Sequence, residues 1–352
     1  MNLNNRFIKI AVPIASILFS FFAGAILIAC IGGNPVEAYR YLFRGAFGSL
    51  SNFGETVAKA VPLIFTGLAA TFAYKCGVFN LGAEGQFVMG ACASIWVNTT
   101  FTGLSGLSLV IVSLICGILA GGLWGYIPGM LKITRGLNEM IVSIMLNYIA
   151  ILFMGFLYTG PLRDGNLPQT ATVVEKLPRI ISGTRIHSGI LIALVLSIIL
   201  WYFLFYTSKG FQLRAVGLNQ TTANFNGYPV KSLMLISFIT SGAIAGLGGS
   251  VELHGTQFRL MAGFGVGYGF DGVAIALISL LNPIGTVIIA YLFAVLRAGA
   301  TTMQVGTGLP TSVIDIVQAL VIIFAVAGNA VTNLPRIRQF IINLSTKSVE
   351  VE

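Results

Sequence analysis

The sequence contains very few charged side chains. Only 9% of its 352 residues are Asp, Glu, Lys or Arg, whereas 56% are hydrophobic. Soluble domains carry about 25% charged residues, so this chain cannot cover a water-exposed surface. The composition therefore excludes a soluble protein and predicts an all-α chain that crosses a membrane repeatedly, at roughly 20 residues per crossing. We expect one membrane domain over residues 1–352, because no length remains for a separate soluble domain.

Side chains that carry catalytic or metal chemistry are also scarce. The two histidines, His187 and His254, lie far apart, and the four cysteines show neither metal-type spacing nor a disulfide framework. The sequence has no GxxxxGK[ST] phosphate loop, no Ser-His-Asp grouping and no pair of catalytic carboxylates. We therefore predict that the chain is not an enzyme, cannot hold ATP and binds no metal or cofactor by itself.

The formal net charge of +9 comes mostly from basic residues in short loops and at the chain ends. In a membrane protein, lipid headgroups and the positive-inside rule explain this pattern better than nucleic acid does. We therefore expect no nucleic-acid partner.

Hydropathy predicts about ten membrane helices. They are Ile8–Gly32, Thr56–Tyr74, Gln86–Thr99, Leu104–Leu131, Asn138–Tyr158, Gly189–Tyr206, Ser232–Ser250, Tyr268–Leu281, Pro283–Thr302 and Pro310–Gly328. The stretch Leu27–Cys30 resembles a lipoprotein processing site, but the apolar run Ile10–Ile31 is longer than a signal core and favours a first membrane span.

An even number of spans places both termini on one side, and that side carries more lysine and arginine. We therefore predict cytoplasmic termini in a plasma membrane. In this topology the loop 159–188 is external and the loop 208–231 is cytoplasmic. The cytoplasmic loop contains a pattern of spaced residues, namely Arg214, Gly217, Asn219 and Gly227. Within it, Thr221–Phe225 could form a short helix. An ordinary connection and a docking segment for a partner are both open interpretations, although most bundle connections run only 2–8 residues.

Glycine is frequent, with 42 residues, and two of its patterns differ in meaning. Gly117, Gly121, Gly125 and Gly129 recur at steps of four, which predicts a smooth stripe where another helix packs closely. The stretch GFGVGYGFDG (263–272) has glycine at alternate positions and predicts an unwound or re-entrant segment before a short eighth helix. FNLGAEG (79–85) likewise precedes a short third helix, so we expect an inverted repeat with broken helices.

Polar residues inside apolar runs are candidates for the transport path or its gate, because polarity at bilayer depth is costly. The candidates are Asn80, Glu84, Gln86, Asn138, Glu139, Asn147 and Asp271. Glu139, Ser143 and Asn147 share one helix side and predict a polar stripe toward the protein interior. Each residue can line a path or bind a neighbouring segment, and Glu139 can also complement a helix N-terminus.

Four motifs resemble a known family when taken in order. They are VFNLGAEGQFVMGA (78–91), GLNEMIVSIMLNYIA (136–150), LRAVGLN (213–219) and SGAIAGLGGSVELHG (241–255). The chain resembles permease subunits of bacterial ABC importers in the ribose and branched-chain amino acid permease superfamily. Within that superfamily it is most similar to the larger permease subunit of nucleoside importers.

The resemblance implies a path for nucleoside uptake, in which Phe79, Tyr148 or Phe270 could stack on the flat base, and it also implies several partners. These are a second homologous permease in a heterodimer, a cytoplasmic tandem ATP-binding subunit that hydrolyses the ATP, and an extracellular substrate-binding lipoprotein. It also implies that the loop 208–231 couples to the ATPase through Arg214, Gly217, Asn219, Ala223 and Gly227. The stretch TTANFNGYP (221–229) departs from the family pattern, because the arginine and the second alanine of that pattern are not at their expected positions. Two alternatives are a permease of the same architecture for a monosaccharide such as ribose, and a secondary transporter that works alone.

Overall fold

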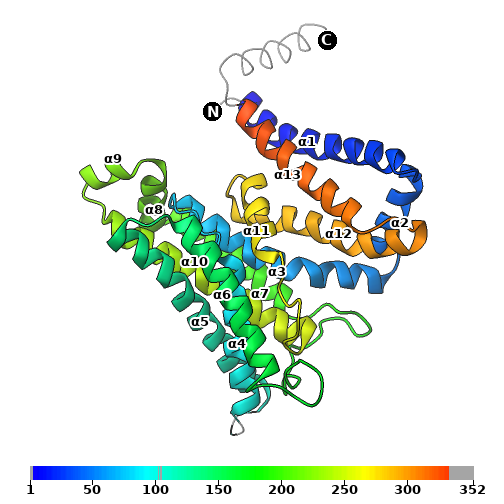
Figure 1. Ribbon diagram of the computed structural model, residues 1–352. Helices are drawn as coiled ribbons and strands as arrows, with labels where there is room; N and C mark the ends of the chain where they lie inside the picture. Colours follow the sequence, from blue (N-terminus) through cyan, green and yellow to red (C-terminus); the bar gives the residue numbers. More distant parts are fainter. Residues whose placement is uncertain (1–2, 102, 104, 333–352) are drawn as a thin grey trace. The chain divides into compact units, whose positions relative to one another are not determined.

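The computed structural model describes residues 3–101, 103 and 105–332, with side chains described between 15 and 328. Regular structure in this part is helical, apart from three isolated β-bridges. The elements in chain order (Figure 1) are α1 (Leu3–Cys30), α2 (Pro35–Phe47), α3 (Leu50–Lys75), α4 (Ala83–Thr100), α5 (Gly106–Arg135), α6 (Glu139–Thr159), α7 (Gly189–Tyr206), α8 (Ser208–Leu218), α9 (Gln220–Phe225), α10 (Val230–Glu252), the π-helix η1 (Leu253–Gln257), α11 (Tyr268–Ile278), α12 (Pro283–Thr307) and α13 (Ser312–Thr332).

Each of the ten predicted helices overlaps a helix of the structure. Within the described residues, α3, α5, α6, α7, α12 and the continuous α10–η1 segment are long and apolar enough to cross a membrane. Shorter apolar helical stretches occur in α1, α11 and α13. The structure thus shows a multi-span helical protein, and the count of ten crossings stays a prediction.

Sequence reasoning missed three helical elements. It treated 208–231 as a loop with one short helix, but the structure has the full helix α8 before the expected α9. It also missed α2 and η1. Hydropathy detects continuous apolar runs, whereas α2 and α8 mix polar and apolar residues and are only 13 and 11 residues long. The π-helix could not be predicted, because it continues α10 and differs from it only in the hydrogen-bond period, which hydropathy does not reveal.

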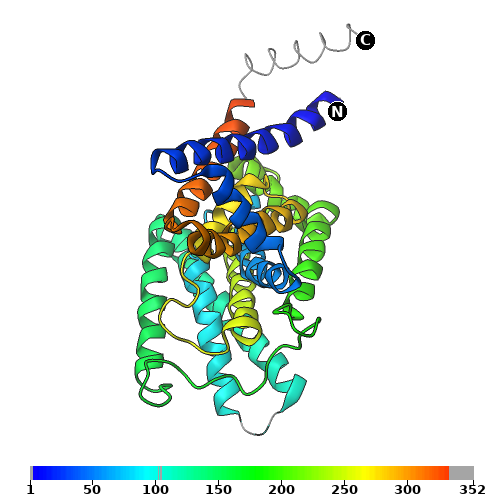
Figure 2. The same ribbon diagram turned by 90° about the vertical axis from the view of Figure 1, so that its right-hand side faces the viewer.

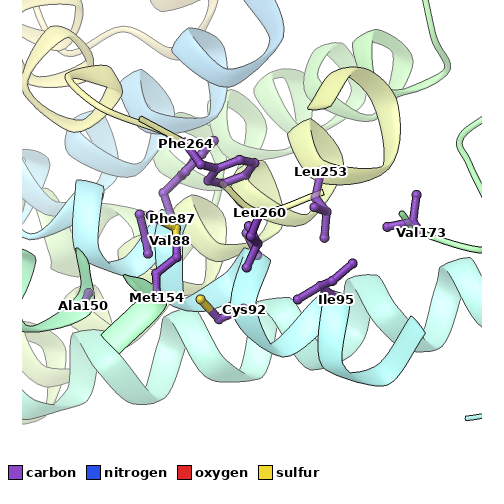
Figure 3. Close-up of a cluster of buried hydrophobic side chains, with 11 residues drawn as sticks. Phe87, Val88, Cys92, Ile95, Ala150, Met154, Val173, Leu253, Leu260 and Phe264 are labelled. Atoms are coloured by element: carbon purple, nitrogen blue, oxygen red, sulfur yellow. The ribbon is translucent and has the colours of Figure 1, made fainter. Parts of the chain in front are cut away.

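The described chain packs as two compact units, one of residues 50–294 and one that combines the residues before 50 with those from 295 onward. In the larger unit α4 is the central helix, and α3, α5, α6, α10 and α11 all pack against it. Figure 3 shows the hydrophobic cluster at its side, where Phe87 and Ile95 of α4 meet Met154 of α6 and Phe264 of the glycine-containing loop. The short third helix predicted from sequence is therefore a core helix that packs against five other helices of this unit.

The predicted glycine stripe on α5 packs directly against α10. A Cβ atom added to Gly121 would lie 2.7 Å from the Cα of Gly246, and one added to Gly125 would lie 3.2 Å from the Cα of Gly242. Side chains larger than hydrogen cannot occupy such a seam, so the two backbones touch. This confirms the close-packing interpretation of the stripe.

The loop 159–188 crosses one end of the larger unit, and Figure 2 shows it running across the lower part of the view from α6 to α7. Hydrogen bonds fasten it to the segment after α10. Thr170 N donates to Leu260 O at 3.0 Å, and Val173 N donates to Phe258 O at 2.8 Å. The loop is therefore an ordered strap, which we call the 159–188 strap.

The smaller unit contains α1, α2, α13 and the second half of α12. α1 and α13 pack along each other, and Phe19 meets Phe324 edge-on with ring centroids 4.8 Å apart. The Tyr39 hydroxyl of α2 donates to Phe21 O of α1 at 2.6 Å. These contacts hold α2 in one position relative to the end of α1.

Candidate functional site

The polar stripe on α6 faces the protein interior, as predicted. Glu139, Ser143 and Asn147 are all buried, whereas Tyr148 on the opposite side is 61% exposed. The preceding residue, Asn138, is exposed and caps the helix, with Oδ1 accepting from Met140 N at 2.9 Å. Asn138 therefore has a structural role at the helix start, and its place on a path stays a prediction.

Asn147 secures the start of α4. Its Oδ1 accepts from Gly85 N at 2.8 Å, and its Nδ2 donates to Leu81 O at 2.8 Å. Gly85 is the third residue of α4, and the first N–H groups of a helix have no partner within the helix. The cap residue Gly82 has no side chain to supply one, so a residue of α6 caps α4 instead.

Asn80 and Gln86 form the second half of this arrangement. Asn80 Nδ2 donates to Gln86 Oε1 and to Ser241 Oγ, both at 2.9 Å, while Asn80 Oδ1 accepts from Gly82 N and Gln86 Nε2. Ser241 in turn donates to Ala69 O at 2.7 Å. Asn80, Gln86, Asn147 and Ser241, which we call the amide clamp, tie α3, α4, α6 and α10 together around an irregular backbone segment.

Glu84 and Asp271 each lie in the first turn of a short helix. Glu84 opens α4 and is 5% exposed, and Asp271 opens α11 and is half-buried. Gly269 of α11 approaches the Glu84 backbone so closely that a Cβ atom there would lie 2.6 Å from Glu84 Cβ. The helix dipole favours a carboxylate at both positions. The structure thus brings Asp271 to the same region as the amide clamp.

Glu139 is held elsewhere. Its carboxylate forms an ion pair with Lys132 in the last turn of α5. Asn147 lies two turns further along α6, about 12 Å away at 1.5 Å per residue. The pair joins the end of α5 to the start of α6.

The aromatic residues proposed for stacking lie outside the amide clamp. Phe79 is 43% exposed and packs against Tyr74, with ring centroids 5.0 Å apart. Phe270 is 50% exposed and Tyr148 is 61% exposed. These rings are accessible to a flat ligand or to a partner protein.

The α8–α9 segment (208–225) is ordered by the predicted coupling residues. Gly217 packs on the backbone of Lys75 at the end of α3, where any Cβ atom would collide with Lys75 O. Asn219 caps α9, with its Oδ1 accepting from Thr222 N at 2.9 Å, and Ala223 is 3% exposed. Gly227 ends the segment with φ +76°, a conformation that favours glycine.

Arg214 of α8 lies above two aromatic rings, one in α7 and one in α8. Its guanidinium carbon is 5.2 Å from the centroid of Phe205 and 5.9 Å from that of Phe211. Lys75 Nζ lies 5.5 Å from the same Phe205 ring. Both cations therefore attach α8 and the end of α3 to α7 by cation–π contacts.

Sequence reasoning assigned no role to the two histidines, and both prove to fasten the 159–188 strap. His254 Nδ1 donates to Glu175 O at 2.8 Å, which leaves Nε2 to accept from Ser94 Oγ at 3.0 Å. His187 Nδ1 accepts from Gly189 N at 3.2 Å, so its Nε2–H donates to Thr256 Oγ1. Burial lowers the pKa of His187 to about 4.

Comparison with known proteins identifies the architecture. Residues 52–326 match the family described as the permease component of branched-chain amino acid transport systems. The chain belongs to this permease family. The permease is 37% identical to the guanosine ABC transporter permease protein NupP of Bacillus subtilis, over 93% of this chain and 95% of NupP.

Other relatives carry different substrate names. The permease is 33% identical to the nucleoside ABC transporter permease protein NupB of Lactococcus lactis, over 92% of each chain. It is 32% identical to the glucose ABC transporter permease protein TsgB13 of Haloferax volcanii, over 89% of this chain and 86% of TsgB13. A second guanosine transporter permease protein of Bacillus subtilis, NupQ, is 28% identical over 68% of this chain.

Two further residues of the permease stand out that sequence reasoning did not single out. Leu218 and Phe225, at the ends of α8 and α9, are 89% and 87% exposed. The signal was present as two large apolar residues in a polar stretch. Their exposure at the ends of short helices, however, required the structure.

Proposed function

We propose that this permease is the transmembrane subunit of an ABC importer that takes up nucleosides. The observation that carries the proposal is the similarity to NupP along nearly the whole of both chains. Such coverage includes the amide clamp, the α8–α9 segment and the 159–188 strap, so the likeness is not confined to one shared helix pair. Energy comes from ATP hydrolysed by a separate subunit.

The amide clamp supports a division of labour within the permease. Asn80, Gln86 and Asn147 already bind backbone groups and one another, so few of their donors and acceptors remain for a substrate. They therefore act as architectural residues that hold short helices in place. The exposed rings of Tyr148 and Phe270 are better candidates for contact with a nucleobase.

The proposed partners follow from the same relationship. The similarity to both NupP and NupQ supports a heterodimer of two homologous permeases. We propose that the α8–α9 segment faces the cytoplasm and docks on a tandem ATPase, with Leu218 and Phe225 as its apolar contacts. An extracellular lipoprotein would deliver the nucleoside at the opposite face of the membrane. In the predicted topology, with ten crossings and cytoplasmic termini, the 159–188 strap lies on that face.

A monosaccharide is the second candidate substrate, because TsgB13 is named for glucose transport. Uptake of radiolabelled guanosine, uridine, ribose and glucose in a strain without this permease distinguishes the two. We expect nucleoside uptake to fall to background and to return when the gene is restored. Loss of sugar uptake with normal nucleoside uptake would overturn the substrate assignment.

A strain that retains this permease separates an ABC importer from a secondary transporter. Removal of the partner ATPase should stop uptake, whereas a proton ionophore should leave it largely intact while cellular ATP is maintained. The reverse result would show that the permease works alone.

A further inference from the structure

Helix α2 packs one face tightly inside the smaller unit. Its buried residues are Ala38, Leu42, Gly45 and Ala46. A Cβ atom on Gly45 would lie 2.6 Å from Thr302 Cβ, and one on Gly299 would lie 2.7 Å from Leu42 Cγ. This face is thus fixed against the second half of α12, and the opposite face of α2 is presented outward.

The outward face combines large apolar side chains with arginine. Val36, Phe43 and Phe47 are 77%, 48% and 48% exposed, and their spacing of seven and four residues places them in one stripe. Arg40 and Arg44 follow along the edge of that stripe and are also exposed. Glu37 is the acidic residue on this face, so its basic groups are in excess.

The position of α2 in the chain indicates what covers this face. α1 is 28 residues long, enough to cross a bilayer, and only four residues separate its end from the start of α2. At 13 residues α2 is about 20 Å long, too short to cross. Exposed apolar side chains of α1, such as Phe22 and Ile26, continue through Ile31 toward Val36. The apolar surface is thus continuous from α1 to α2.

Asn34 ends the connection by capping α2. Its Oδ1 accepts from Val36 N at 3.1 Å and Glu37 N at 3.4 Å. Together with the Tyr39 bond to α1, this cap fixes the direction in which α2 leaves the membrane helix. Figure 1 shows α2 turning across the end of α1 instead of continuing along it.

We propose that α2 is an interfacial helix that lies in the lipid headgroup layer, with Phe43 and Phe47 inserted toward the acyl chains and Arg40 and Arg44 binding the phosphates of anionic lipids. A helix with apolar residues on one stripe and basic residues beside it binds membranes in this way. Each basic residue near an anionic surface contributes about a five-fold preference for the charged lipid.

The test uses the full-length permease, with its partner subunits, in bilayers of phosphatidylcholine. A bimane fluorophore is attached at Phe43→Cys in a Cys30→Ala background, because Cys30 is an exposed thiol. A fixed fraction of the lipid is either phosphatidylglycerol or phosphatidylcholine that carries a doxyl quencher near the headgroup. We expect both lipids to quench the fluorophore, and phosphatidylglycerol to quench several-fold more effectively.

The double variant Arg40→Gln/Arg44→Gln should bring the two quenching efficiencies to equality. The control Arg163→Gln/Arg179→Gln makes the same change in net charge on the 159–188 strap and should leave the preference intact. Equal quenching in the parent protein would overturn the anionic preference. Protection of the fluorophore from both lipids would show that a protein partner or a second permease covers α2, and would overturn the proposal as a whole.

Discussion

Replacement of Asn147 by alanine offers a direct test of the amide clamp. The substitution removes one acceptor from Gly85 N–H and one donor from Leu81 C=O, both of which are bound at 2.8 Å. Gly85 is buried, so its N–H has little access to water once the side chain is gone. The start of α4 then lacks a cap, because Gly82 has no side chain.

The expected loss of stability is about 2–4 kcal/mol. An unsatisfied buried donor or acceptor costs roughly 1–3 kcal/mol, and two are created. Two such groups together would cost about 2–6 kcal/mol. Hydrogen bonds between side chains in membrane proteins average closer to 0.6 kcal/mol, so we expect a value in the lower part of that range. Thermal unfolding in detergent should therefore shift down by about 4–16 °C, at roughly 2–4 °C per kcal/mol.

The assay can use the protein's own thiols. Cys76 and Cys92 are buried and become reactive toward a maleimide dye only as the larger unit unfolds. Asn166→Ala is the matched control, because Asn166 is exposed on the 159–188 strap and the same substitution there should change stability by less than about 0.5 kcal/mol. If Asn147→Ala unfolds at the parent temperature but abolishes nucleoside uptake, the amide serves the transport path and the clamp interpretation is wrong.

Three further outcomes are expected. Gly246→Ala should destabilise the permease by about 1–3 kcal/mol, because its methyl group would collide with α5. The control Gly155→Ala should not change stability in the same unfolding assay, because its Cβ would meet only Tyr158 Oη, at 3.9 Å. Acidification should lower stability, because His187 binds a proton in the unfolded chain near pH 6.5 but only near pH 4 when folded. The stability that folding gains from neutral His187 is fully present above pH 6.5 and is lost as the pH falls toward 4. The loss amounts to about 2 kcal/mol by pH 5. Unfolding scans of His187→Gln should therefore show a weaker pH dependence than the parent protein. Leu218→Ser/Phe225→Ser should reduce co-purification of the ATPase at least ten-fold without changing the unfolding temperature; unchanged association would refute the docking role of these residues.

The membrane class and most helices could be predicted from the sequence, because apolar runs and their flanking loops are local signals. The stripe of Glu139, Ser143 and Asn147 was likewise predicted to face inward, since helical periodicity alone places the three residues together. The partners of that stripe could not be predicted. Asn80 and Ser241 are 161 residues apart, and hydropathy contains no information on which helices become neighbours.

The glycine residues also show that a sequence pattern does not identify the packing partner of a helix. The stripe on α5 indicated a close approach, but no local pattern could identify Gly242 and Gly246 of α10 as the residues that pack into it. The amphipathic helix α2 was not predicted, because the hydropathies of its apolar and polar faces cancel when hydropathy is averaged along the sequence. Its identity depends on which residues are buried, and burial is set by α12, more than 250 residues later.

The polar residues in this apolar chain and its short helices are two aspects of one feature. α4 and α11 begin inside the larger unit, and their cap positions, Gly82 and Gly267, have no side chain to bind the first N–H groups. At α4 those groups are buried away from bulk water, so acceptors must come from elsewhere in the protein. Asn147 supplies one from α6, and Glu84 and Asp271 lie where the helix dipoles favour negative charge. A carboxylate or amide is therefore stable at these positions because a helix starts there, and the helix can start there because the polar residue is present.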